Sequence, residues 1–352
     1  MRFLIWIVLV ILVIVRFFTT LPKYSDGQKV RISDRVKTEP VRYSYNQSFR
    51  LSGVGVYLPK YPEVSYGDEV IVEGIVKSGK ILDAKLLEVN KGNGLLLEFR
   101  ERLIKFYEFF LPQPYSGLVA GLVLGSKTGL SASFWELLKT TSTAHVVVAS
   151  GMNVTLVAGF LVGATSLFLP RRKGVILAML GVWLYAFLSG FDAPIIRAAV
   201  MGSVAFTAQA LGRLASAWKG LFLSGMVMLV IWPGWITDLG FILSFVATAS
   251  ILIFESKIKK ILTNFPKILR EDLSVTLAAQ IGVSPIIFAT FGQFNLLSPI
   301  INVLVLWTVA PITIIAGVSA IVGLAFPQIG RLLLYLCYPL VFWFVKVIEV
   351  FS

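Results

Sequence analysis

The sequence predicts a polytopic α-helical membrane domain, preceded by an N-terminal signal anchor and a small extracytoplasmic OB-like β-barrel domain. Two observations support this fold class. The 352 residues are 57% hydrophobic and their mean hydropathy is +0.82, which is typical of a protein with several membrane spans. Long apolar segments also follow one another from residue 115 onward, whereas residues 19–94 have the alternating pattern of short strands.

Residues 1–18 predict a transmembrane signal anchor. An unbroken apolar run from Phe3 to Val15 lies between Arg2 and Arg16, and such a run can cross a hydrocarbon core about 30 Å thick when interfacial residues extend it. A cleaved signal peptide is the alternative. No small-residue cleavage site follows the run, so retention as an anchor is favoured.

Residues 19–94 predict the OB-like β domain. Residues 67–90 indicate two strands joined by a turn at Ser78-Gly79, and residues 28–36 and 49–58 are further strand candidates. Several short strands with glycine turns suit a small barrel such as the OB-fold. Other small β folds fit the pattern nearly as well.

Residues 95–112 predict an amphipathic helix that joins the two domains. Apolar side chains recur at helical spacing from Leu95 to Phe110, and charged ones occupy the opposite face. Such a helix typically lies along the membrane surface. Pro112 and Pro114 end it.

Residues 113–352 predict the helical membrane domain. Alternate loops of this part carry most of its lysine and arginine, while the loops near Asp192, Asp238 and Gln293 carry none. By the positive-inside rule the basic loops are cytoplasmic, which places the N-terminus inside and the β domain and C-terminus outside. The expected spans are residues 151–170, 174–190, 194–212, 219–233, 238–254, 273–291, 295–326 (broken at Pro311) and 329–350.

A polar stretch interrupts the apolar chain between residues 124 and 157. It predicts a short helix over residues 131–141 with Ser131 as its N-cap, followed by a break at Ser150–Asn153 before a long helix. A short helix, a break and a long helix are typical of a re-entrant or discontinuous element that lines a pathway. The alternative is a contact between helices that small residues bring close together.

Further polar side chains in the predicted spans suggest either a pathway or internal packing. Arg197 either pairs with Asp192 or faces an aqueous path and binds an anion. The single histidine, His145, is by composition alone more often an interior residue than a functional one, and one histidine cannot supply a multi-histidine metal site. The lone cysteine, Cys337, cannot form an intrachain disulfide.

Four sequence elements together carry a family resemblance. They are GLVLGSKTGLS with STAHVVVASGMNVTLVAG, then SGFDAPIIRAAVMG, WPGWITDLGFILSFVATA, and LAAQIGVSPIIFATFGQFNLLSPIINVLV. In this order they resemble the bacterial competence DNA-uptake channel family, the ComEC type, over roughly residues 115–325. His145, Ser150, Gly151 and Arg197 match the family pattern, whereas Asn153 departs from it because many members have histidine there.

The resemblance implies translocation of single-stranded DNA across the bacterial cytoplasmic membrane during natural transformation. It implies no catalytic activity and no cofactor. The expected form is one without the metallo-β-lactamase-like domain that many relatives append, and the sequence has no Walker motif. A separate nuclease and a cytoplasmic DNA-translocating ATPase or helicase are therefore expected partners, with a DNA-receptor protein as a further one.

Two sets of side chains are the expected DNA contacts. A single strand needs positive potential and stacking surfaces. The expected pathway residues are His145, Ser150, Gly151, Asn153, Asp192, Arg197, Asp238, Gln280, Gln293 and Asn302. On the β domain, Tyr43, Tyr45, Phe49, Arg50, Tyr57, Lys60 and Tyr61 interleave aromatic and basic residues as a DNA platform would, although half of them could belong to the core.

Two other classes of function fit the same residues. The first is a transporter or flippase for a small anionic solute or a lipid-linked sugar. The second is a membrane scaffold whose β domain docks a partner. Salt-dependent binding of single-stranded DNA would distinguish the channel from both.

Overall fold

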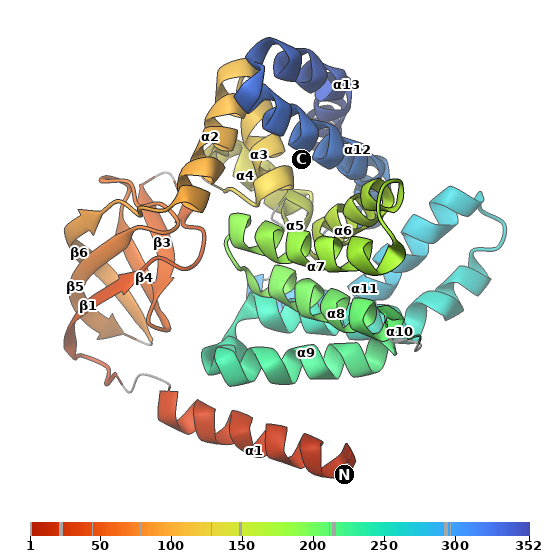
Figure 1. The fold of residues 1–352 in the computed structure, drawn as a ribbon. Helices are drawn as coiled ribbons and strands as arrows, with labels where there is room; N and C mark the ends of the chain where they lie inside the picture. The colour runs from red at the N-terminus through yellow and green to blue at the C-terminus, as the bar shows by residue number, and fades with distance from the viewer. Residues whose placement is uncertain are drawn as a thin grey trace.

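A computed structural model describes residues 2–20, 24–43, 45–77, 79–127, 129–147, 150–210, 212, 216–291, 295 and 297–352. The chain folds into a β-sheet domain and a larger helical domain, with the N-terminal helix alongside the latter (Figure 1). Predicted site residue Gln293 lies outside the described residues.

The β domain is one six-stranded sheet in the order β1-β5-β6-β4-β3-β2. Its strands alternate buried and exposed side chains, as the sequence pattern predicts. Neighbouring strands are antiparallel except β4 and β6, which are parallel. The strands are β1 (Lys29–Arg35), β2 (Val41–Arg42), β3 (Asn46–Leu51), β4 (Val54–Pro59), β5 (Glu69–Lys77) and β6 (Lys80–Asn90).

The predicted barrel is not closed. Within the described residues, no backbone ladder joins β1 to β3, although the two strands are in contact. A side-chain link takes the place of that ladder at one end: Asp34, in β1, accepts hydrogen bonds from the backbone nitrogen and the Oγ of Ser52 at 3.2 and 2.9 Å. Ser52 lies in the β3–β4 turn and has a φ of 47°. Its two hydrogen bonds to Asp34 hold this turn against β1.

The helices follow the predicted spans closely. They are α1 (Arg2–Thr20), α2 (Leu95–Phe110), α3 (Tyr115–Leu124), α4 (Ala132–Thr140), α5 (Ala144–Val147), α6 (Gly151–Ser166), α7 (Arg171–Leu188), α8 (Ala193–Ala210), α9 (Ala217–Ile231), the 3₁₀ helix η1 (Pro233–Thr237), α10 (Leu239–Ile261), α11 (Lys267–Phe291), α12 (Ser298–Ala325) and α13 (Pro327–Phe351). As predicted, Ser131 caps the short helix α4, since its Oγ accepts a hydrogen bond from the Phe134 nitrogen.

The predicted break at Pro311 is wrong. Helix α12 runs unbroken past it from Ser298 to Ala325. Neighbouring helices can support a proline within a membrane helix, and α12 packs against α2, α3 and α13. The Tyr107 hydroxyl of α2 also donates a hydrogen bond of 3.0 Å to the Ala316 carbonyl of α12.

Five helical segments of the described residues are long and apolar enough to cross a membrane by length and composition. They are Ala144–Thr165, Leu239–Ile261, Arg270–Thr290, Ser298–Ala325 and Pro327–Phe351. Shorter apolar helices accompany them, among them α3, Lys173–Leu188, Ala193–Ala208 and α9. The helical domain thus has the composition of a multi-pass membrane protein.

The helical domain has two apolar cores. One joins α2 to α5 with α12 and α13 around side chains such as Leu118, Leu122 and Phe344. The other joins α6 to α10 around Ile195, Ile196 and Met228. Helix α2 contributes Leu103, Phe106 and Tyr107 to the first core. It therefore packs into the helical domain, while its membrane-surface position stays a prediction.

The β domain contacts the loops that lack basic residues. Arg50 of β3 forms an ion pair with Asp238 at the start of α10, and Tyr66 lies beside Gly190 at the end of α7. In Figure 1 the β domain lies on one side of the helices and the turn between α10 and α11 lies on the other; lysines flank this turn at the end of α10 and the start of α11. This arrangement agrees with the orientation that the loop charges predict.

Candidate functional site around Arg197

Arg197 borders a cavity of about 450 Å³ between α6, α8 and α9. Helix α8 presents its arginine one turn after Ala193, and α6 begins beside it at Gly151. The cavity is lined by Gly151, Met152 and Thr155 of α6, by Arg197, Ala198, Met201, Gly202, Val204 and Ala205 of α8, and by Ser216, Ala217 and Gly220 at the start of α9. Arg197 is the charged residue in this lining.

The Arg197 guanidinium has no carboxylate partner within 4 Å among the described residues. Its Nη1 donates a hydrogen bond to the Thr248 hydroxyl of α10, whereas its Nε is buried without a hydrogen-bond partner. An arginine inside a membrane domain without an acid to neutralise it is costly and is usually functional. It leaves a positive charge for a negatively charged ligand.

Gly151 brings the start of α6 against this guanidinium. A Cβ added at Gly151 would lie 2.8 Å from Arg197 Nη2, closer than side-chain carbons approach such atoms. The free amide groups and the dipole at a helix N-terminus attract anions. The start of α6 and Arg197 therefore place two favourable groups for an anion on one side of the cavity.

The predicted alternative of an Arg197–Asp192 ion pair is wrong. Asp192 Oδ2 lies 3.0 Å from Nζ of Lys127, and both side chains are largely buried. Lys127 precedes α4 and Asp192 precedes α8, so this pair joins two loops of the helical domain. Arg197 is left to Thr248 and the cavity.

Ser150 and Asn153 both lie at the start of α6, but their side chains have different surroundings. Ser150 is the N-cap residue of α6, and its Oγ is buried without a hydrogen-bond partner. Asn153 is fully buried and its Nδ2 donates a hydrogen bond of 3.0 Å to the Leu122 carbonyl of α3. Asn153 thus fixes α6 against α3 and does not line the cavity.

His145 lies apart from the cavity. It belongs to the short helix α5, its side chain is exposed, and its Nδ1 lies 2.9 Å from the Ser142 carbonyl oxygen. The sequence placed it only five residues before Ser150. The structure does not bring it to Arg197, so the two predicted pathway residues form separate features.

Gln280 and Asn302 form a third polar group, between α11 and α12. Gln280 Nε2 donates a hydrogen bond of 3.1 Å to Ser298 Oγ, and Asn302 Nδ2 lies 3.5 Å from the same oxygen. Both Ser298 and Asn302 are buried. The structure therefore brings these two predicted residues together, but as a link between helices.

The predicted β-domain platform divides into exposed, paired and core residues. Tyr45 and Tyr61 are 91% and 68% exposed, and Lys60 Nζ lies 5.6 Å from the Tyr61 ring centroid. Phe49 belongs to the domain core instead. Three members interact elsewhere: Tyr43 lies under Lys139 of α4, Tyr57 lies under Lys80, and Arg50 pairs with Asp238 at 2.6 Å.

Sequence reasoning missed a buried ion pair between the two domains. Arg100 of α2 lies 2.9 Å from Glu39 of the β domain, with 8% and 1% of the two side chains exposed. Arg100 Nε also donates to the Leu188 carbonyl at 2.6 Å, and Ser126 Oγ donates to Glu39 at 3.2 Å. The signal in the sequence was that Arg100 falls at helical spacing on the same face of α2 as Leu103 and Tyr107, which are buried.

Tyr66 completes this junction. The Arg100 guanidinium lies 5.4 Å from its ring centroid, and its hydroxyl lies 3.5 Å from the Phe187 carbonyl. Burial raises the pKa of Tyr66 to about 12. Its hydroxyl therefore stays neutral near the Glu39 carboxylate at physiological pH.

Comparisons with known proteins agree with the resemblance. ComE operon protein 3 of Bacillus subtilis (strain 168) is 28% identical over 210 residues, or 59% of this chain and 26% of that protein. An uncharacterized protein of Aquifex aeolicus is 30% identical over 232 residues, or 64% of this chain and 52% of that protein. Recombination protein 2 of Haemophilus influenzae is 30% identical over 90 residues, or 23% of this chain and 11% of that protein.

The chain spans at most about half the length of these curated relatives. No solved structure shows a significant match to it. A family model described as "Competence protein" matches residues 122–352, which hold the cavity, Arg197 and the helices around them. Because that match covers well over half of the sequence, the chain belongs to the competence protein family.

Proposed function

We propose that this protein passes single-stranded DNA across the bacterial cytoplasmic membrane during DNA uptake. Membership of the competence family and the DNA-uptake resemblance support the role in uptake. The observation that supports a polyanionic substrate best is the Arg197 guanidinium, which borders a cavity without a carboxylate partner among the described residues. A strand carries one negative charge per nucleotide, so each passing phosphate could bind there in turn.

The proposal includes a direction and a set of partners. Strand entry is from the β domain, which lies outside the cytoplasm in this proposal, and the helical domain conducts the strand inward. The exposed Tyr45 and Tyr61 with Lys60 supply stacking and charge for the first contacts. A separate nuclease and a cytoplasmic ATPase or helicase supply strand degradation and energy, and this chain acts as a conduit without catalysis.

Substituting Arg197 tests the proposal. We expect Arg197→Ala to lower DNA uptake by about tenfold or more, because hydrogen bonds to charged groups contribute about 1.5–3 kcal/mol. Arg197→Lys should retain part of the uptake, since it keeps the charge but loses the planar donor geometry. The measurement is internalised labelled DNA in a deletion strain that expresses each variant at equal membrane abundance.

Arg331→Ala is the matched control, because Arg331 is an exposed arginine at the start of α13, away from the cavity. It should leave uptake unchanged. Normal uptake by Arg197→Ala would remove Arg197 from the pathway. In liposomes, the wild-type protein should bind single-stranded oligonucleotides at low salt, and binding of a small anion without binding of DNA would favour a solute transporter instead.

A further inference from the structure

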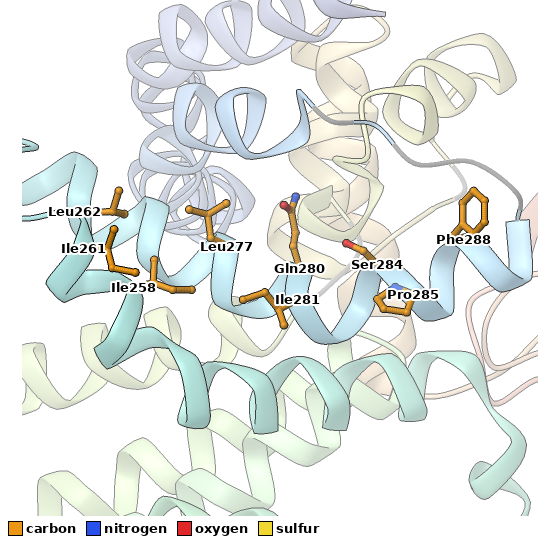
Figure 2. Close-up of a pocket in the computed structure, with 9 residues that line it drawn as sticks. All are labelled: Ile258, Ile261, Leu262, Leu277, Gln280, Ile281, Ser284, Pro285 and Phe288. Carbon is orange, nitrogen blue, oxygen red and sulfur yellow. The ribbon is translucent and has the colours of Figure 1, made fainter.

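A second cavity runs along one side of α11 and is almost entirely apolar. It has a volume of about 770 Å³, and seven of its nine lining residues are apolar (Figure 2). On α11 the lining residues recur every three or four positions from Leu277 to Phe288, so they occupy one face of the helix. Ile258, Ile261 and Leu262 at the end of α10 close one end of the groove.

The groove has the length of one membrane leaflet. Leu277 and Phe288 are eleven residues apart, which corresponds to about 16 Å at 1.5 Å per residue. A hydrocarbon core is about 30 Å thick, so this length is about half of it. The groove also lies within Arg270–Thr290, a segment apolar enough to cross a membrane.

The lining does not suit a hydrophilic solute. Gln280 and Ser284 are its polar residues, and Gln280 already donates a hydrogen bond to Ser298. Apolar side chains on the groove remain open, since Ile281 and Phe288 are 49% and 62% exposed. An apolar chain that fills the groove would cover them.

Positive charge lies at the end of the groove that α10 closes. Residues 256–270, which comprise the end of α10, the turn after it and the start of α11, hold five basic residues and no acidic residue. Lys259 pairs with Glu271 at 3.4 Å, whereas no carboxylate of the described residues pairs with Lys257, Lys260 or Lys267. Basic residues beside a membrane helix attract anionic lipid headgroups.

We propose that this groove binds an anionic phospholipid. One acyl chain lies along Leu277, Ile281 and Phe288, and the phosphate lies against the lysines at the end of α10 and the start of α11. The length of the groove, its apolar lining and the basic charge at one end fit the two parts of such a molecule. The site is separate from the Arg197 cavity, so the proposal does not depend on the role of Arg197.

The test measures lipid retained by the purified protein. Wild-type protein is reconstituted in nanodiscs that contain equal amounts of phosphatidylglycerol and phosphatidylcholine, and is then released into mild detergent. Native mass spectrometry counts the lipids that stay bound. We expect retained phosphatidylglycerol in excess of phosphatidylcholine.

Two sets of variants locate the retained lipid. Ile281→Trp fills the groove and should abolish retention, whereas Ile321→Trp, at an exposed isoleucine of α12 outside the groove, should not. Replacing Lys257, Lys260 and Lys267 with glutamine should remove the preference for phosphatidylglycerol. The matched control replaces Lys77, Lys80 and Lys85, three exposed lysines of the β domain, with glutamine and should keep the preference.

Several outcomes would overturn the proposal. Equal retention of the two lipids by the wild-type protein would exclude headgroup recognition. Retention unaffected by both Ile281→Trp and the lysine variant would place the lipid elsewhere. The protein could also be released as a dimer that binds lipid only after it dissociates. That result would assign the groove to a second copy of the chain. The lysine variant changes exposed side chains only, so it keeps the test valid if Ile281→Trp fails to fold.

Discussion

Arg197 differs from Lys127 and Lys259 of the helical domain in what surrounds it. Lys127 and Asp192 neutralise each other, and Lys259 pairs with Glu271. Arg197 has a threonine hydroxyl and a helix start as its neighbours instead. Under the proposed function, the absence of a carboxylate partner among the described residues is what suits Arg197 to an anionic ligand.

Gly151 offers a test of this local geometry that leaves the charge in place. We expect Gly151→Ala to reduce DNA uptake and Gly151→Val to reduce it further, because a Cβ would displace Arg197 Nη2, now 2.8 Å from that position. The guanidinium is the far end of a flexible side chain, so it can move and the protein should still fold. The measurement is DNA uptake at equal membrane abundance.

Gly159→Ala is the control for this prediction, since no atom lies within 4 Å of a Cβ added there on the same helix. It should keep wild-type uptake. If both alanine variants keep full uptake, the position of the guanidinium against α6 has no importance for transport.

At the scale of single elements, α2 connects the β domain to the helical domain. Its Tyr107 reaches α12 and its Arg100 reaches both Glu39 and the end of α7. A buried charge that loses its partner is strongly destabilising, by about 3–5 kcal/mol. The Glu39–Arg100 pair should therefore hold the two domains together.

We expect Glu39→Ala to lower the apparent Tm of the detergent-purified protein clearly, because it leaves the buried Arg100 guanidinium with the Leu188 carbonyl oxygen as its remaining hydrogen-bond acceptor among the described residues. Glu69→Ala should change the apparent Tm little. Its partner Arg35 is about half exposed, and exposed pairs contribute about 0–1 kcal/mol. Equal shifts for the two variants would contradict a structural role for the buried pair.

Local sequence signals predicted individual elements better than their contacts. The N-cap at Ser131 located α4 and the apolar runs located most spans, because such signals depend on neighbouring residues. Gly151 and Arg197 were both predicted site residues, but the contact between them depends on how α6 packs against α8. Glu39 and Arg100 are 61 residues apart, and no pattern along the chain relates them.

The same limit explains the two errors in the fold. Strand alternation predicts a sheet, but closure depends on whether β1 and β3 approach closely enough to form a ladder, and here Asp34 and Ser52 link them through side chains. A proline predicts a weak point, but the packing of α12 against its neighbours decides whether Pro311 breaks the helix.

For the molecule as a whole, the β domain lies at the helix ends that the loop charges place outside the cytoplasm. This predicts opposite labelling of two cysteine variants in intact cells. A membrane-impermeant maleimide should modify Lys77→Cys, in the β domain, and should leave Asn264→Cys, in the α10–α11 turn, unmodified until the membrane is opened. Replacing the buried native Cys337 with alanine removes background labelling.

The reverse pattern would invert the membrane orientation and with it the direction of strand entry. Labelling of both positions in intact cells would show that no sealed membrane separates Asn264→Cys from the added maleimide. Labelling of Lys80→Cys, at the start of the neighbouring strand β6, gives a second measurement of the accessibility of the β domain.

Among the described residues, two ion pairs join the domains, and they differ in how they respond to ionic strength. Arg50–Asp238 is partly open to solvent, with 42% and 23% of the side chains exposed, whereas Glu39–Arg100 is buried. Salt screens exposed charges far more than buried ones. Rising salt would therefore loosen the first pair and leave the second as a pivot, about which the β domain could swing away from the start of α10.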